Sequence, residues 1–144
     1  MYQQSLVALV SIQEDPVIVA ILFCIGQIQY IQDNPYESLQ TFKLALPLTK
    51  TVFGDDSNAV AACNNSIGVL HYCCPNGEND VALKYLLKSL SHKQLCGTLL
   101  GTVWNNVGRV HFQNGNFDRA IEAYQKALQI RNGSCLDCAA TIFK

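Results

Sequence analysis

The chain has 144 residues, enough for one domain of ordinary size; 49% of them are apolar and 15% are charged. This composition excludes an intrinsically disordered chain, which has few apolar residues and a large net charge. The net charge of −1 gives no electrostatic basis for binding nucleic acid or an anionic membrane surface.

The segments that could direct the chain to a membrane do not have the required patterns. The longest apolar run, residues 17–25, is about half of the roughly 20 residues that a spanning helix needs, so we expect a buried helix there. Residues 1–4 lack the basic side chains that begin a secretory signal. The seven cysteines, an odd number scattered over several segments, fit reduced thiols in a cytosolic or nuclear compartment better than a disulfide framework. We therefore expect a cytoplasmic protein.

In chain order, the first elements are half of one helix pair and then a complete pair. Residues 1–13 have the pattern of the second helix of an earlier pair. Asp15, followed by a proline, predicts the N-terminus of the next helix, because aspartate caps helices and proline suits the first helical position. Asn34 with Glu37 predicts the second helix of this repeat, opened by a capping box. The first full repeat is thus residues 15–53.

The second full repeat is predicted over residues 57–95. Gly54 can end the preceding helix with a positive φ, and Ser57 can cap the next one. A third full repeat follows over residues 98–132, with a turn at residues 114–116 that supplies a glycine and then an N-cap.

The last predicted element is a half repeat over residues 134–144, which begins after an Asn-Gly-Ser stretch. We therefore interpret residues 1–144 as a single array of three full helix pairs between two halves.

The repeats share a glycine at one position of their first helices. Gly26, Gly68 and Gly108 lie 42 and 40 residues apart, and self-similarity at such a period marks a stacked helical array. In the third repeat we expect Gly108 and Ala120 to lie where the two helices cross, because small residues let helix axes approach to about 8–10 Å. The sequence therefore predicts an all-α fold.

The third repeat carries the most informative pattern, which resembles the tetratricopeptide repeat (TPR). The residues concerned are Trp104, Val107, Gly108, His111, Gly115, Phe117, Ala120, Tyr124 and Ala127. The standard unit has about 34 residues, and the longer spacing here is similar to that of the kinesin-light-chain type. So are the Phe-Gly turn and acidic stretch at residues 53–56 and the Asn-Asn motifs at residues 64–68 and 105–108. This resemblance implies a right-handed α-solenoid of antiparallel helix pairs, with about eight helices.

In such arrays the first helices line a concave groove that holds a peptide of a partner protein. The resemblance implies that the groove is lined by Gln27, Tyr30, Asn65, Val69, Tyr72, Asn105, Arg109 and Phe112. Amide side chains would then bond the peptide backbone, aromatic rings would cover its side chains, and Arg109 would pair with an acidic residue. The alternative is that these residues are merely the exposed face of each helix. The clamp of the chaperone-tail-binding subclass is not expected, because its positions hold Phe23, Gln27, Ser66 and Thr102.

The cysteines suggest one chemical alternative. Cys135 and Cys138 form a CxxC pair, but zinc needs about four ligands and a redox CxxC accompanies a βαβ unit. Cys138 also falls at an apolar position of the repeat, so the simpler interpretation is a core cysteine with a neighbour.

The remaining polar candidates have structural interpretations. His71 and His111 occupy one repeat position, where we expect them to pack between helices. Glu122 and Lys126 are spaced as a solvated helix pair. The chain has no phosphate-binding loop, nucleophile elbow or HExxH motif. We therefore expect no enzyme, no cofactor and no metal.

The resulting prediction is a non-catalytic protein–protein interaction module that binds peptide segments of partner proteins. Two alternatives stay open: a structural subunit of a larger assembly and, more remotely, a cysteine-based zinc or redox regulator. The predicted partners are a protein or peptide, further repeats of the same chain or a complex subunit, and not nucleic acid or a membrane.

Overall fold

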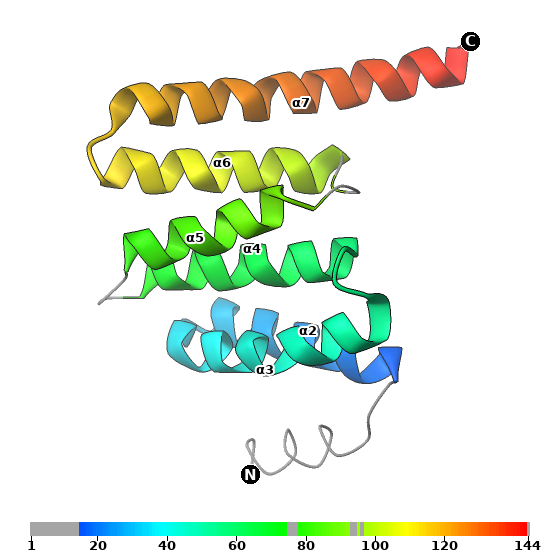
Figure 1. Cartoon of the computed structure of the whole chain (residues 1–144), viewed down its shortest axis with the longest axis vertical. Coiled ribbons are helices and arrows are strands. Elements are labelled where there is room, and N and C mark those ends of the chain that lie inside the picture. The colour runs from blue at the N-terminus through cyan, green and yellow to red at the C-terminus, as the bar shows by residue number, and fades with distance from the viewer. Residues whose placement is uncertain (1–14, 75–77, 93–94, 96, 144) are drawn as a thin grey trace.

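The computed structural model describes residues 15–74, 78–92, 95 and 97–143, with the side chains of residues 133–143 outside this description. These residues form six helices: α2 (Pro16–Ile31), α3 (Pro35–Phe53), α4 (Asn58–Cys73), α5 (Asn79–Leu90), α6 (Gly97–Gln113) and α7 (Phe117–Phe143). Consecutive helices run antiparallel and stack in chain order from α2 to α7 (Figure 1). The prediction of an all-α fold built from antiparallel helix pairs is confirmed.

The prediction of about eight helices is wrong, because the described part of the chain contains six. The predicted half repeat at residues 1–13 lies outside the described residues. The predicted separate helix at residues 134–144 does not begin anew, since α7 continues from Phe117 to Phe143. A single glycine inside a helix costs only about 1 kcal/mol relative to alanine, so Gly133 does not have to end α7. Among the described helices, none has the length and apolarity that a membrane crossing requires.

Side-chain caps fix two of the helix starts. Asp15 accepts a hydrogen bond from the backbone N–H of Val17 at 3.0 Å, and Ser57 accepts one from Val60 at 3.2 Å, as predicted. Asn34 is at the start of α3 but forms no side-chain cap, so the predicted capping box is wrong. Its ψ of 65° lies outside the extended region that a capping residue adopts, so its side chain is not directed at the first-turn amides.

Two turns depend on a backbone conformation that favours glycine. Gly54 after α3 has φ of 91°, and Gly115 between α6 and α7 has φ of 78°. Side chains with a Cβ are strained at such angles, which explains why both predicted turns contain glycine.

One close contact recurs in each helix pair and sets the distance between its helices. The repeated glycine of the first helix lies against a large side chain of the second. A Cβ atom added to the glycine would lie 2.5 to 2.8 Å from that side chain in the pairs Gly26–Phe42, Gly68–Leu86 and Gly108–Tyr124. A real Cβ does not approach other atoms so closely, so each pair needs glycine here. The predicted close approach at Gly108 is confirmed, and Ala120 nearby is 2% exposed.

The core runs from one pair to the next. One apolar cluster joins α2, α3 and α4 around Leu22 and Ile67, and a second joins α4 to α7 around Leu86 and Val107. Helix α4 contributes to both clusters, so each repeat is buried by its neighbours, as expected of a solenoid.

Candidate functional site

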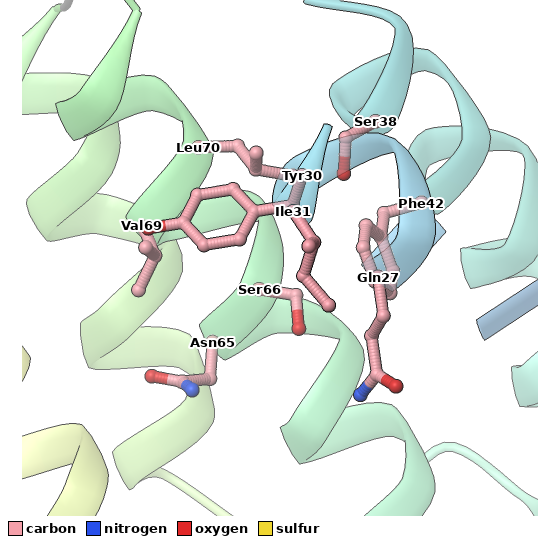
Figure 2. Close-up of a pocket in the computed structure, with 9 residues that line it drawn as sticks. All are labelled: Gln27, Tyr30, Ile31, Ser38, Phe42, Asn65, Ser66, Val69 and Leu70. Atoms are coloured by element: carbon pink, nitrogen blue, oxygen red, sulfur yellow. The ribbon is translucent and has the colours of Figure 1, made fainter. Parts of the chain in front are cut away.

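A hollow of about 290 Å³ opens between α2 and α4, and α3 forms its floor. It is lined by Gln27, Tyr30, Ile31, Ser38, Phe42, Asn65, Ser66, Val69 and Leu70. The Tyr30 ring reaches from α2 toward Val69 on α4 (Figure 2). The hollow therefore brings together four of the eight predicted groove residues, namely Gln27, Tyr30, Asn65 and Val69.

The floor and the rim of this hollow differ in character. Phe42, the side chain that packs on Gly26, and Leu70 supply apolar surface, and both are almost fully buried. Ser38 donates a hydrogen bond to the carbonyl of Gly26 at 2.6 Å, so its hydroxyl hydrogen is already used. At the rim, the exposed Gln27 carries an amide that can both donate and accept. An apolar floor with a few polar groups at its edge is typical of ligand sites.

A second hollow occupies the same place one repeat further on, between α4 and α6 with α5 as its floor. It is lined by Val69, Tyr72, Leu86, Asn106, Arg109 and Val110. These residues stand at the repeat positions of Gln27, Tyr30, Phe42, Ser66, Val69 and Leu70 in the first hollow. The second hollow has no room for a water molecule. Asn106 and Arg109 are larger than Ser66 and Val69, which explains why the second hollow is smaller than the first.

Two contacts fill the second hollow. The guanidinium carbon of Arg109 lies 5.0 Å from the centre of the Tyr72 ring, a cation–π arrangement. The amide nitrogen of Asn106 donates to the side-chain oxygen of Asn65 at 2.9 Å. Asn106 is 8% exposed and was missed as a site residue. The Asn-Asn motif at residues 105–106 was the available signal, since it places an amide on each of two neighbouring faces.

Tyr30 and Cys73 meet at the α4 side of the first hollow. The Tyr30 hydroxyl lies 3.8 Å from the Cys73 sulfur, within hydrogen-bond range for sulfur. This hydrogen bond, the electrostatic interaction with Cys73 and burial raise the pKa of Tyr30, while the charge of Arg109 lowers it. The Tyr30 ring is therefore held toward α4 as a neutral phenol.

The other predicted groove residues do not join the first hollow. Tyr72 and Arg109 line the second one. Asn105 is half-buried and lines neither hollow. Phe112 is 58% exposed and packs on the edge of the Phe117 ring, with 5.5 Å between ring centres, near the turn between α6 and α7.

The histidine and cysteine candidates give no metal site in the described residues. The His71 ring stacks on Tyr85 of α5 with 5.6 Å between ring centres, and burial lowers the pKa of both His71 and His111. No group of three His, Cys, Asp or Glu residues that could hold a metal ion occurs in the part of the chain searched. The side chains of Cys135 and Cys138 lie outside the described residues.

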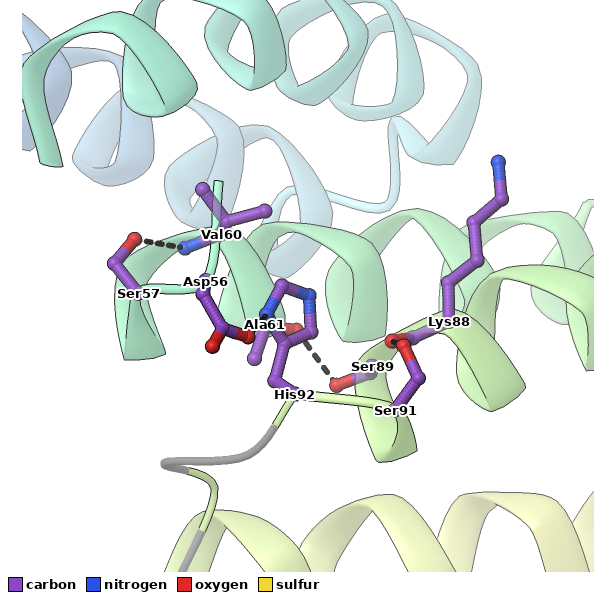
Figure 3. Close-up of polar contacts among 8 residues, drawn as sticks. All are labelled: Asp56, Ser57, Val60, Ala61, Lys88, Ser89, Ser91 and His92. Atoms are coloured by element: carbon purple, nitrogen blue, oxygen red, sulfur yellow. Dashed lines mark hydrogen bonds and ion pairs between the residues drawn. The ribbon is translucent and has the colours of Figure 1, made fainter. Parts of the chain in front are cut away.

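A separate polar cluster holds the start of α4 to the end of α5 (Figure 3). Ser89 donates to the carbonyl of Ala61 at 2.8 Å, and the cap formed by Ser57 lies beside this contact. The imidazole nitrogen of His92 lies 3.4 Å from a carboxylate oxygen of Asp56. These contacts join two helices, so their role is structural.

Comparison with known proteins identifies the repeat type. The tetratricopeptide repeat profile matches residues 102–132, which include most of α6 and the first half of α7. A search of curated proteins finds no match. Among solved structures, the chain is similar to BtubC (BKLC) from P. vanneervenii, with 22% identity and a TM-score of 0.73 over 83% of this chain and 49% of that chain.

The chain thus spans about half the length of BtubC, which is a kinesin light chain-like tetratricopeptide protein. Residues 102–132 match the tetratricopeptide repeat profile, and the predicted resemblance to this repeat type is confirmed at the level of the fold.

Proposed function

We propose that the chain is a non-catalytic interaction module that binds an extended peptide segment of a partner protein along its row of hollows. The observation that carries this proposal is the repetition of one site in two successive repeats, open between α2 and α4 and filled between α4 and α6. A peptide in extended form presents side chains at regular intervals, so a regularly spaced row suits it.

The two hollows would recognise different parts of such a peptide. In the open hollow, Phe42 and Leu70 would receive an apolar side chain, and Gln27 would hydrogen-bond the peptide backbone. In the filled one, Arg109 is exposed and carries a fixed positive charge over the Tyr72 ring. An acidic residue of the ligand could pair with it there.

The test starts from a displayed library of random peptides selected on the purified chain. Selected peptides are then titrated by calorimetry against the parent and two variants. Ser66→Trp fills the open hollow and should weaken peptide binding by about a hundredfold, which corresponds to a loss of about 2.7 kcal/mol of binding free energy. Leu87→Trp is the matched control, because Leu87 is 50% exposed on α5 and lines neither hollow.

A milder pair of variants tests the filled hollow. Arg109→Ala should lower the affinity of peptides that carry an acidic residue by about tenfold. Gln113→Ala, which also changes an exposed side chain of α6, should leave their binding unchanged, because Gln113 lines neither hollow. Selected peptides that bind all four variants as tightly as the parent would contradict the proposal.

A further inference from the structure

An aromatic residue recurs at one position in the first helices of the described pairs, four residues after the repeated glycine. Tyr30 in α2, Tyr72 in α4 and Phe112 in α6 hold this position. Tyr30 lines the open hollow and Tyr72 lines the filled one, so the aromatic residues follow the face that carries the hollows. Tyr30 and Phe112 are 45% and 58% exposed, which leaves ring surface for a ligand. We call these three residues the aromatic row.

Contacts with neighbouring helices hold two rings of the aromatic row in place. The Tyr30 hydroxyl lies 3.8 Å from the Cys73 sulfur on α4. The guanidinium carbon of Arg109 on α6 lies 5.0 Å from the centre of the Tyr72 ring. Rings that are already positioned lose little conformational freedom when a ligand binds, and this favours affinity.

The spacing of the aromatic row suits one backbone conformation of a ligand. The rings recur once per repeat, and neighbouring first helices such as α4 and α6, which contact each other, have axes on the order of 10 Å apart. A polyproline II helix presents the same face every three residues, or about 9 Å. A β-strand presents the same face at intervals of about 6.6 Å and about 13 Å, which lie on either side of the spacing of the row.

The polar groups beside the aromatic row favour a ligand rich in carbonyl groups. The Arg109 guanidinium can only donate hydrogen bonds, and the exposed Gln27 carries an NH₂ group. The side-chain oxygen of Asn65 already accepts a hydrogen bond from Asn106, while both of its own N–H groups can serve a ligand. Neither hollow is lined by a carboxylate among the described residues. Because proline has a carbonyl oxygen and no N–H group, a proline-rich segment supplies acceptors without donors that need a partner.

We propose, building on the proposed function, that the peptide bound in this groove is a proline-rich segment of a partner protein. It lies along the aromatic row as a polyproline II helix, with one proline ring on each aromatic ring. Its carbonyl oxygens accept hydrogen bonds from Gln27, Asn65 and Arg109. Such a segment already has the polyproline II form in water, so it loses little conformational entropy on binding.

The test measures the binding of fluorescein-labelled oligoprolines of increasing length to the full chain by fluorescence anisotropy. Affinity should rise with length up to about seven prolines and change little beyond that, because the two intervals between three rings need about 20 Å of polyproline II helix. A labelled Gly-Ser peptide of the same length is flexible and keeps its N–H groups. It should bind at least about tenfold more weakly.

Variants locate the binding on the aromatic row. Phe112→Leu removes the last ring and should lower the affinity of the longest oligoproline by about tenfold. It should also shorten the length at which affinity stops rising by about three residues, which is one repeat interval. Tyr30→Leu, at the other end of the row, should have the same two effects. Tyr36→Leu is the matched control, because Tyr36 is 70% exposed and lies outside the row.

The outcomes separate this class of ligand from the proposed function itself. Circular dichroism should show that all three variants keep the helix content of the parent. Oligoprolines that do not bind, while proline-free library peptides bind and depend on the open hollow, would overturn the ligand class and leave the peptide groove standing. Oligoproline binding that is as tight in Phe112→Leu and Tyr30→Leu as in the parent would overturn the ligand class as well. If neither library peptides nor oligoprolines bind, both proposals are wrong.

Discussion

The first and third helix pairs share one geometry but use different chemistry where their helices meet. The second helix of the third pair places alanines at the contact, namely Ala120, Ala123 and Ala127, all at most 4% exposed. The first pair has Ser38 and Thr41 at the first two of these positions, also buried. Ser38 donates to Gly26 and Thr41 donates to the Gln29 side chain, both at 2.6 Å.

The comparison shows that the side chains at this helix contact must be small. They can be polar when each polar atom has a hydrogen-bond partner. The repeat profile matches the third pair, whose contact residues are apolar. Four predictions test which stabilising features the two helix pairs have in common and which are found in only one of them.

The largest effect should come from the repeated glycine, the feature that the pairs share. Gly26→Val and Gly108→Val should each lower the free energy of unfolding by about 3 kcal/mol, because the new side chain collides with Phe42 or Tyr124. Chemical denaturation measures this. Gly101→Ala is the control on α6: its Cβ would meet ordinary contacts at 3.5 Å, so it should stabilise the chain by up to about 1 kcal/mol. A loss of stability in only one of these two valine variants would contradict the claim that both pairs need glycine at this position.

The second effect concerns the polar contact found in the first pair. Thr41→Val should lower the free energy of unfolding by about 1–3 kcal/mol, because the amide of Gln29, which is 3% exposed, loses its partner. Thr51→Val, which changes an exposed threonine on the same helix, should have little effect. The double variant Gln29→Leu/Thr41→Val should recover part of the loss. An equal cost for Thr41→Val and Thr51→Val would argue that the buried hydrogen bond contributes nothing.

A smaller effect is expected at the helix starts. Asp15→Ala and Ser57→Ala should each cost about 1 kcal/mol, because each removes an acceptor for a first-turn amide. Asn34→Ala should cost much less, since Asn34 makes no such bond. Thermal melting ranks the three variants, and a loss at Asn34 equal to that at Asp15 would contradict the assignment.

The smallest effect is a difference between the pairs in how their contribution to the free energy of unfolding depends on pH. Gln29 in the first pair stands at the repeat position of His111 in the third. Burial lowers the pKa of His111 below its ordinary value of 6.5, so the unfolded chain binds more protons just below pH 6.5. The free energy of unfolding should therefore fall as the pH drops through 6.5. His111→Gln should reduce this fall, measured by denaturation at several pH values, whereas Gln29→Ala should leave it unchanged.

Much of the fold could be predicted because its determinants are local or recur in the chain. The glycine spacing identified the repeat, and Asp15 and Ser57 marked helix starts through contacts with residues two or three positions away. The helix count was wrong because the Asn-Gly pair at residues 132–133 does not end α7. Local turn signals do not show whether a long helix will continue through them.

The candidate site could be predicted only in part. Helical spacing placed Gln27 and Tyr30 on one face, but the open hollow also needs Phe42 from the next helix and a small residue, Ser66, opposite. The residues that line the open hollow come from three helices, so their proximity depends on how these helices pack. The binding role of the predicted groove residues and the expected cytoplasmic location stay predictions.

The hydrogen bond between Asn65 and Asn106 ties the two hollows together. The Asn65 side-chain oxygen has two lone pairs, so it could accept a second hydrogen bond from a ligand in the open hollow while keeping that of Asn106. A ligand bonded to Asn65 would thus share an acceptor atom with one of the side chains that fill the next hollow.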